Sequence, residues 1–188
     1  MTQIDAAIEA ENSPKLFSDL NISEELKQGI KELGYTAFTN FQRGVFDSFR
    51  LGKNIVGEGK SNYGKSLAFS LPILAKIDPN LAEVQALIIC ETALQSEIAI
   101  KECKALGRHL NVSVGNVTSS AQVVILALAD LHKLDSKAAS SLKTVFFDCL
   151  SKPCADSALN LLSQNLPQLQ IMIYGQDTLA AFKESASN

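Results

Sequence analysis

A glycine-rich stretch between a predicted strand and a predicted helix constrains the fold of this chain more than any other feature. Residues 59–66 read GKSNYGKS and match the phosphate-loop pattern G-x-x-x-x-G-K-[ST] at every defined position. The apolar pattern of residues 54–58 predicts a short strand before it, and that of residues 65–77 predicts a helix after it. We expect Pro72 to kink this helix or to end its first part. A strand, a phosphate loop and a helix in this order favour an α/β domain.

Strands and helices alternate along the rest of the chain. Continuous apolar runs, typical of strands buried on both faces, lie at residues 86–90, 123–127, 142–147 and 170–174, with a further short strand candidate at 112–114. Helical spacing of apolar residues predicts helices over residues 26–33, 39–50, 93–106 and 155–164. Buried strands that alternate with helices imply right-handed crossovers. We therefore expect an α/β fold of three layers, in which helices flank a mostly parallel sheet.

The composition is that of one globular domain. The chain has 188 residues, 46% of them apolar and 20% charged, and its net charge at pH 7 is −3. This charge does not exclude nucleic-acid binding, but it lacks the basic surplus that would suggest it. No apolar run reaches about 18 residues, the length of a membrane span, so we expect no membrane partner. We expect one domain over residues 14–183, after a flexible tail over residues 1–13.

The cysteines lack the spacing of a metal site. Cys90, Cys103, Cys149 and Cys154 form no C-x-x-C pair, and neither histidine stands at ligand spacing from any of them. Reduced, mostly buried thiols are the simplest interpretation, because disulfides are rare inside cells. The N-terminal residues also lack the positive and apolar regions of a secretory signal. These observations predict a cytoplasmic protein.

The glycine-rich stretch has the residues that a phosphate site needs. Gly59 and Gly64 let the backbone turn tightly and present its N–H groups, and the helix dipole adds positive potential. Lys65 would reach the outer phosphates of a nucleotide, and the Ser66 hydroxyl would bind Mg²⁺. The residues that fill the loop are Ser61, Asn62 and Tyr63. The last two are bulky and would distort the phosphate cradle, and the alternative for the whole stretch is a chance turn before a helix.

A second element of a nucleotide site lies at the end of a later strand. Residues 145–148 read VFFD, so an apolar strand ends at Asp148, which would hold Mg²⁺ opposite Ser66, usually through water. The alternative is an aspartate that caps the following turn. The next three residues are Cys149, Leu150 and Ser151. None of them is a carboxylate that would orient the attacking water, so the sequence predicts nucleotide binding with impaired hydrolysis and assigns no catalytic residue.

The order of these features resembles a known family. Phe17, the pair Gly34-Tyr35, Thr39 and Gln42 precede the phosphate loop, and residues 67–72 after it read LAFSLP. This arrangement is similar to the N-terminal RecA-like domain of DEAD-box RNA helicases, especially those of the translation-initiation type. The resemblance runs from about residue 17 to residue 182. It implies a P-loop NTPase fold of the RecA-like type, without a counterpart in this chain of the family's second RecA-like domain.

The resemblance also implies how a nucleotide is recognised. Phe17 would stack near the adenine, and Gln42 would read the adenine edge with help from Thr39, the group of residues called the Q motif in the family. The implied ligands are ATP or ADP with Mg²⁺. Phe38 and Phe41 stand where the family has proline and isoleucine. On the alternative interpretation, the three phenylalanines are ordinary core residues.

The residues that contact RNA in the family are replaced in this chain. The family's P-T-R-E-L motif corresponds to Glu91, Thr92, Ala93 and Leu94, which lack its arginine. The T-P-G-R motif corresponds to residues 127–130, so that Asp130 replaces an arginine, and the D-E-A-D motif reads DCLS from Asp148. The S-A-T motif, near residues 175–177, is not recognisable. Because phosphate contacts dominate nucleic-acid affinity, we expect only weak RNA binding.

Three functions are compatible with this sequence. The first is a helicase-like domain that binds nucleotide and hydrolyses it little or not at all. The second is a protein-interaction module that keeps the helicase fold without its chemistry. The third is a fragment of an active RNA-dependent ATPase, against which Cys149 and Asp130 argue. The first two are compatible with each other if nucleotide stabilises the surface that binds a protein partner.

Overall fold

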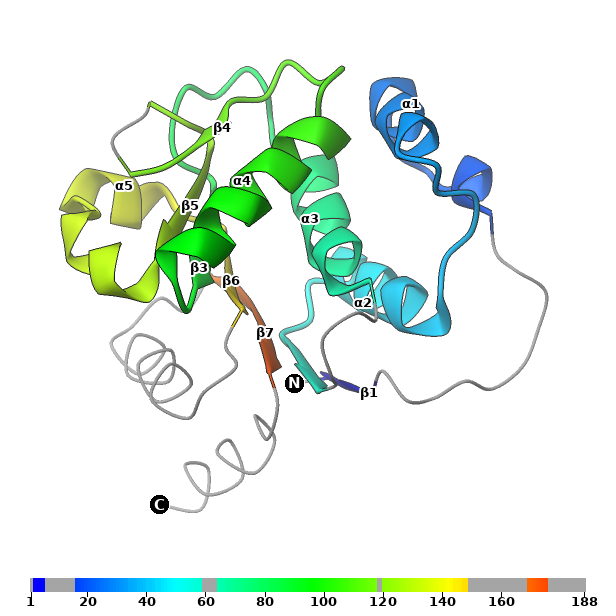
Figure 1. The fold of residues 1–188 in the computed structure, drawn as a ribbon, viewed down its shortest axis with the longest axis horizontal. Coiled ribbons are helices and arrows are strands. Elements are labelled where there is room, and N and C mark those ends of the chain that lie inside the picture. The colour runs from blue at the N-terminus through cyan, green and yellow to red at the C-terminus, as the bar shows by residue number, and fades with distance from the viewer. Residues whose placement is uncertain (1, 6–15, 59–63, 118–119, 149–168, 176–188) are drawn as a thin grey trace.

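The strands form a single parallel sheet in the computed structural model, which describes residues 2–5, 16–58, 64–117, 120–148 and 169–175 (Figure 1). Within these residues, seven strands pair in the order β1-β2-β7-β6-β3-β5-β4. All six pairings are parallel. The strands are β1 (Thr2–Asp5), β2 (Ile55–Glu58), β3 (Ala86–Cys90), β4 (Val114–Gly115), β5 (Val123–Ala127), β6 (Thr144–Asp148) and β7 (Gln170–Gly175). This confirms the expected α/β fold with a parallel sheet.

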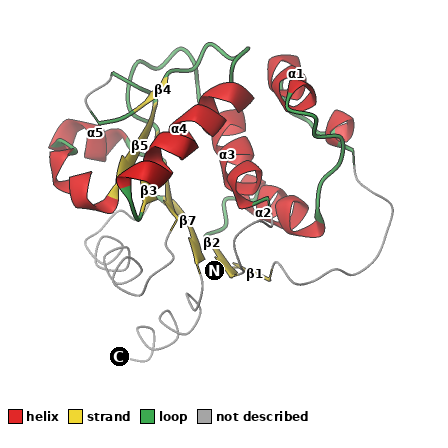
Figure 2. Cartoon of the chain, in the orientation of Figure 1, coloured by secondary structure: helices red, strands yellow, loops and turns green. Residues whose placement is uncertain are grey.

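Helices connect the strands, and α2, α3 and α4 lie side by side along the sheet (Figure 2). The described helices are α1 (Glu24–Glu32), α2 (Asn40–Arg50), α3 (Lys65–Lys76), α4 (Ala93–Leu106) and α5 (Ser136–Ser141), with 3₁₀ turns η1 (Phe17–Asp19) and η2 (Leu128–Lys133). Both α2 and α4 begin with a capping box, in which a threonine and a glutamine satisfy each other's backbone N–H groups. None of the described helices has the length and apolar character needed to cross a membrane.

The core consists of two apolar clusters, one on each face of the sheet, among the described residues. Successive residues of a strand point to opposite faces. Ile88 therefore joins the cluster beneath α2, α3 and α4, whereas Leu87 and Ile89 join the cluster on the other face. The strands are buried on both faces, as their continuous apolar runs predict.

Two tight contacts hold the helices on the first face. Any side chain at Gly29 would overlap the backbone carbonyl of Leu106, so α1 crosses close to the end of α4. Glu32 then binds Arg108 at 3.1 Å and His109 at 2.9 Å just after α4. The ends of α1 and α4 are thereby fixed to each other.

The structure corrects several expectations about individual elements. Thr2–Asp5 form the edge strand β1, although we expected residues 1–13 to be a flexible tail. Pro72 does not end the first part of α3, because the helix continues through it to Lys76 with Pro72 buried. The sequence analysis did not predict η2 or α5, which are short and lack a regular apolar spacing. The helix expected over residues 155–164 lies outside the described residues.

Candidate nucleotide site

The candidate site lies at the carboxyl edge of the sheet, along which the C-terminal ends of the parallel strands lie side by side. β2 leads through the phosphate loop to α3, and β6 ends at Asp148. Asp148 lies opposite Cys90 of β3 and Tyr174 of β7 in the sheet register. This edge is where ligands bind in open parallel sheets, so the topology itself favours a site here.

α3 begins at this edge of the sheet. Gly64 is the N-cap, with φ +70° and ψ 31°, the left-handed conformation that favours glycine. Its carbonyl accepts the first helical bond, from Ala68 N at 3.1 Å. Within the described residues no side chain caps α3. The first backbone N–H groups of a helix have no acceptor within the helix, so this terminus can bind an anion.

Lys65, the first residue of α3, reaches across to β6. Its Nζ donates a hydrogen bond to Asp148 Oδ1 at 2.5 Å, and both side chains are largely shielded from solvent. The same Nζ lies 5.7 Å from the centre of the Tyr174 ring. The structure thus brings together the lysine and the aspartate that the sequence analysis assigned to one site, 83 residues apart in the chain.

A buried cysteine lies beside this pair without joining its chemistry. Burial raises the pKa of the Cys90 thiol to about 12, and the negative charge of Asp148 adds to the rise. Cys90 therefore stays protonated at neutral pH and is not a nucleophile.

Gln42 links the start of α2 to the phosphate loop. Its Oε1 accepts a hydrogen bond from Thr39 N at 2.9 Å, and its Nε2 donates to the Gly64 carbonyl at 3.1 Å. A Cβ on Gly64 would lie 2.5 Å from this Nε2. The side chain that was expected to read adenine thus holds the N-cap of α3, and the glycine is needed for that close approach.

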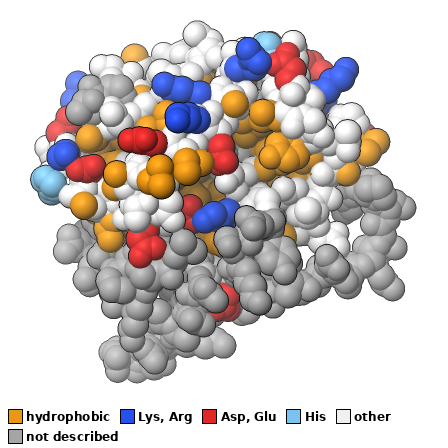
Figure 3. All heavy atoms as spheres, viewed as in Figure 1, with side chains coloured by type: hydrophobic (Ala, Val, Ile, Leu, Met, Phe, Trp, Pro, Cys, Tyr) orange, Lys and Arg blue, Asp and Glu red, His pale blue; other side chains and the backbone are white. Residues whose placement is uncertain are grey.

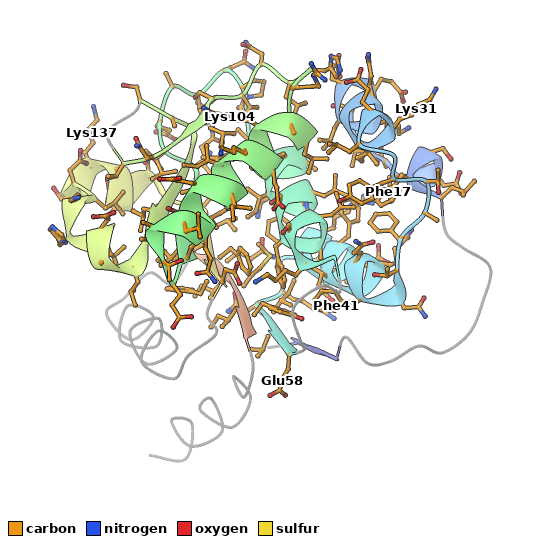
Figure 4. The ribbon with its side chains drawn as sticks, viewed as in Figure 1. Phe17, Lys31, Phe41, Glu58, Lys104 and Lys137 are labelled. Atoms are coloured by element: carbon orange, nitrogen blue, oxygen red, sulfur yellow. The ribbon has the colours of Figure 1, made fainter. Side chains whose placement is uncertain are left out.

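The three phenylalanines before and in α2 pack in the core. Phe17 is 4% exposed, and its ring centre lies 4.0 Å from that of Phe38. Phe41 packs against Phe69 and Tyr174, with ring centres 5.9 Å and 5.5 Å away. Figure 4 shows Phe17 and Phe41 among the helices, whereas Lys104 projects from α4. This is the arrangement of ordinary core residues, the alternative that the sequence left open.

A cavity of about 610 Å³ opens beside the first turn of α3. Gly64, Lys65 and Ser66 form one wall of it. The other lining residues are Leu33, Tyr35, Leu67, Ser70, Lys101, Glu102, Ala105 and Leu106. The sequence analysis named Tyr35 only as part of the resemblance and missed the α4 residues, because their contribution depends on how α4 packs beside α3.

The carboxyl ends of β3 and β5 carry a different surface. Cys90 pairs with Ala127, so Glu91 and Leu128 extend from neighbouring strand ends. Asp130 forms an ion pair with Lys133 at 2.6 Å. Leu94 is 67% exposed and Ile98, one turn further along α4, is 46% exposed. Figure 3 shows hydrophobic side chains on the face of the molecule that carries α4.

Some predicted site residues are not part of this geometry. Gly59, Ser61, Asn62 and Tyr63 lie outside the described residues. The effect of the two bulky loop residues on the phosphate cradle therefore stays a prediction. Among the described residues no group of three or more His, Cys, Asp or Glu side chains is placed to hold a metal ion. That Ser66 and Asp148 bind Mg²⁺ therefore stays a prediction.

Comparison with known proteins points to one family. A model of the DEAD/DEAH box helicase family matches residues 39–148, from the N-cap of α2 to the end of β6. A probable ATP-dependent RNA helicase ddx6 of Dictyostelium discoideum is 26% identical over 198 residues, which cover 89% of this chain. This chain spans 45% of the length of that relative.

Solved structures with this fold include Dbp5 of S. cerevisiae. Dbp5 bound to RNA and ADP BeF3 superposes with a TM-score of 0.75 at 16% identity, over 92% of this chain and 49% of that one. A Dbp5 variant bound to Gle1 and IP6 also gives a TM-score of 0.75, at 15% identity, over 93% of this chain and 51% of that one. This likeness shows that the fold is the RecA-like fold.

Proposed function

Because this chain belongs to the DEAD/DEAH box helicase family, we propose that it binds the phosphates of ATP or ADP, together with Mg²⁺, at the start of α3. The observation that carries this proposal is the N-terminus of α3, which no described side chain caps and whose first residue, Lys65, lies against Asp148. A positive helix end, a lysine and a facing carboxylate are the parts that a nucleotide phosphate and its cation require. The nucleotide bound to Dbp5 supports the same ligand class.

The residues at the edge fit these ligands. The first N–H groups of α3 can donate to phosphate oxygens, and Gln42 holds Gly64, the N-cap, through a hydrogen bond to its carbonyl. In this proposal Lys65 exchanges its bond with Asp148 for one with an outer phosphate. Ser66 and Asp148 would then offer hard oxygen ligands, which Mg²⁺ prefers. Bound Mg²⁺ would neutralise negative charge on the phosphates.

We further propose that hydrolysis is weak or absent, which would make the domain a pseudoenzyme. Catalysis of phosphoryl transfer depends on a group that positions the attacking water. The residues after Asp148 are Cys149, Leu150 and Ser151, and none of them has a carboxylate to position that water. ATP turnover in the presence of saturating single-stranded RNA tests this directly. RNA-stimulated turnover by the unaltered chain would favour an active ATPase instead.

Weak RNA binding is part of the same proposal, although RNA is bound to the related Dbp5. The positions that correspond to the family's RNA-contacting arginines are Ala93 and Asp130. Glu91 adds a carboxylate at the same end of the sheet. Phosphate contacts supply most non-specific affinity, so a neutral and acidic edge is a poor RNA surface.

A second candidate function is protein interaction. The specific observation in its favour is the exposed pair Leu94 and Ile98, which lie one turn apart on α4 beside the acidic strand ends. Exposed apolar side chains at helical spacing are typical of surfaces that receive another protein. The Gle1 bound to a Dbp5 variant supports a protein partner for this fold.

We propose a cytoplasmic location. Cys90 and Cys103 are both buried and unpaired. Burial raises the pKa of the Cys103 thiol to about 12. Stable free thiols of this kind are consistent with a reducing compartment.

The nucleotide proposal is tested by titrating the purified chain with Mg²⁺-ADP in a calorimeter. We expect a dissociation constant in the micromolar range, which is about −8 kcal/mol. Lys65→Ala should abolish the heat of binding, because it removes the cation that meets the phosphates. The matched control is Lys104→Ala, which removes the same charge from an exposed site on α4. Equal affinities for the unaltered chain and Lys65→Ala would contradict the proposal.

A further inference from the structure

The amino ends of the strands lie at the opposite edge of the sheet from the candidate nucleotide site. There β7 begins between β2 and β6 with Gln170, which is 6% exposed. Gln170 Nε2 donates to the carbonyls of Phe49 and Lys53, both at 2.9 Å. Its Oε1 accepts a hydrogen bond from Lys76 Nζ at 2.8 Å. One buried side chain thus ties together the end of α2, the turn before β2 and the end of α3.

Four exposed cations come from the segments that meet at Gln170, and we call them the amino-edge patch: Arg50, Lys53, Lys76 and Lys143. Lys143 comes directly before β6, and its carbonyl accepts a hydrogen bond from Gln170 N at 3.0 Å. Partial burial of its amine lowers the pKa of Lys76, and the positive charge of Lys143 lowers it further. The two amines are therefore close enough to repel each other. Like charges gathered in this way give the edge a positive potential.

Few carboxylates offset this charge. Within the part of the chain that the structure describes, Arg50, Lys53 and Lys76 form no ion pair. Lys143 lies 3.9 Å from Glu83, and both side chains are 46% exposed. An exposed pair at this distance contributes little, so the positive charge of the patch stays available to a partner. It contrasts with the net charge of −3 for the whole chain.

An exposed leucine lies within the same turn as two of these cations. Leu51 is the C-cap of α2, between Arg50 and Lys53 in the chain, and is 71% exposed. Gly52, with φ +72°, follows it, and its N–H donates to the Phe49 carbonyl at 2.9 Å. Leu51 therefore lies at the tip of a tight turn. A large apolar side chain held in water gains free energy when a partner covers it.

We propose that the amino-edge patch docks an acidic peptide segment of another protein, whose carboxylates face the four cations and whose large apolar side chain covers Leu51. Complementary charge selects an acidic partner, and the leucine selects an apolar residue within it. An RNA strand is also acidic, but it would gain little from an aliphatic side chain, because bases stack on aromatic rings. The inference goes beyond the proposed function, since it needs neither nucleotide nor the apolar pair on α4.

The experiment titrates a fluorescein-labelled peptide of repeated Glu-Glu-Leu units with the full chain and follows its fluorescence anisotropy. Two further peptides of the same length, built from Gln-Gln-Leu and from Glu-Glu-Ser units, lack the charge or the apolar residue. We expect the first peptide to bind at least about fivefold more tightly than either of the others, because it meets both features of the patch. Its affinity should fall as salt is added, since salt screens exposed charges. Absence of binding by the first peptide would overturn the inference.

Variants then locate the binding. The double variant Lys53→Glu, Lys143→Glu should weaken the Glu-Glu-Leu peptide by at least about tenfold, because two attractions become repulsions. Gln170 is bonded to the backbone of Lys53 and Lys143 and not to their side chains, so this variant should unfold at the same temperature as the unaltered chain. The matched control is Lys31→Glu, Lys104→Glu, which reverses two exposed charges on α1 and α4 and should leave the affinity unchanged.

Leu51→Ser separates a peptide from a nucleic acid. It should weaken the Glu-Glu-Leu peptide by about fivefold, because the apolar contact is lost. It should leave the Glu-Glu-Ser peptide and a single-stranded oligouridylate unchanged, since neither has an apolar side chain to cover Leu51.

The other outcomes are equally decisive. Equal losses from the two double variants would mean that net charge, and not the patch, attracts the peptide, and would overturn the inference. So would an oligouridylate that binds more tightly than the peptide and depends on Lys53 and Lys143, because the patch would then be an RNA surface. If the unaltered chain binds no ADP, the proposed function fails and this inference stands, since the patch lies at the opposite edge of the sheet.

Discussion

The carboxyl edge of the sheet has two halves, one between β2 and α3 and one at the ends of β3 and β5. They differ in the chemical groups that lie there. At the β2–α3 half, backbone N–H groups, Gly64 and the Lys65–Asp148 pair face the edge. At the β3–β5 half, the described side chains at the strand ends include Glu91, the exposed Leu94 and Asp130. The first half has the residues that we propose bind phosphate, whereas the second has Ala93 and Asp130 at the positions where the resemblance implies arginines that contact RNA.

The separation follows from the topology. The phosphate loop joins β2 to α3 on one side of β7 and β6, and β3 and β5 lie on the other side. Changes in the residues after β3 and β5 therefore leave the cap of α3 and its contact with Gln42 intact. We therefore expect nucleotide binding and RNA binding to be separable in this chain.

The largest expected effect comes from breaking the first half at Gly64. Gly64→Ala should lower ADP affinity by about a hundredfold or more, because the left-handed backbone disfavours a side chain and the new Cβ displaces Gln42. Gly52→Ala is the matched control, since Gly52 has φ +72° and open space around its Cβ position. Both variants should lose about 1 kcal/mol of folding stability from the backbone conformation. ADP titration and urea unfolding measure the two effects, and equal ADP affinities would contradict the assignment of Gly64.

Reversing the charge of the second half should restore RNA affinity. The double variant Ala93→Arg, Asp130→Arg should bind a single-stranded oligouridylate at least about tenfold more tightly at low salt, because two cations then face the phosphates. The slope of the logarithm of its RNA-binding constant against the logarithm of the salt concentration should steepen by about 1.4, the value for two phosphate contacts on single-stranded RNA. ADP affinity should not change.

The control for this variant carries the same added charge at the opposite edge. Ala82→Arg, Glu83→Arg changes two exposed residues in the segment before β3. Fluorescence anisotropy with labelled RNA compares the two double variants. An equal gain from both would mean that net charge, and not the position of the strand ends, limits RNA binding.

A smaller effect is expected where the two halves meet, at Asp148. Asp148→Asn removes the partner that holds Lys65. Without Mg²⁺, ADP affinity should rise several-fold, because the phosphates no longer compete with a carboxylate for the lysine. With Mg²⁺ it should fall, because a ligand for the cation is lost. ADP titrations in Mg²⁺ and in a chelator measure both directions, and an unchanged affinity in both would contradict the role of the pair.

The smallest effect is expected at Glu32, which belongs to neither half. Hydrogen bonds from His109 and Gln28 lower the pKa of this carboxyl below its ordinary value of 4.5, with help from the charge of Arg108. A lowered folded-state pKa stabilises the fold above pH 4.5, and this contribution is lost as the pH falls through the lowered value. Glu32→Gln should therefore be slightly less stable at pH 7 and equal to the unaltered chain in acid. Urea unfolding across this pH range checks the sign.

The sequence predicted most of the fold because its signals were local. The apolar runs of β3 and β5 and the spacing of α4 gave these elements with the bounds that the structure has. The phosphate loop predicted α3 from Lys65 onward. Thr2–Asp5 were missed because an edge strand this short has no apolar run of its own and depends on pairing with β2.

The candidate site was less predictable. Lys65 belongs to the phosphate-loop pattern and Asp148 ends an apolar strand. Their hydrogen bond therefore followed from the expected topology. The hydrogen bond from Gln42 to Gly64 and the burial of Phe17 depend on tertiary packing, which the spacing of residues in the sequence does not predict. The cavity beside Tyr35 depends on the angle between α3 and α4, which no single segment encodes.

The most direct test of the separation between the two halves is a pair of titrations of the same sample, at one salt concentration, with Mg²⁺-ADP and with a single-stranded oligouridylate. The account predicts that ADP binds in the micromolar range and that the RNA binds at least about tenfold more weakly. RNA binding as tight as ADP binding, or no ADP binding at all, would contradict it.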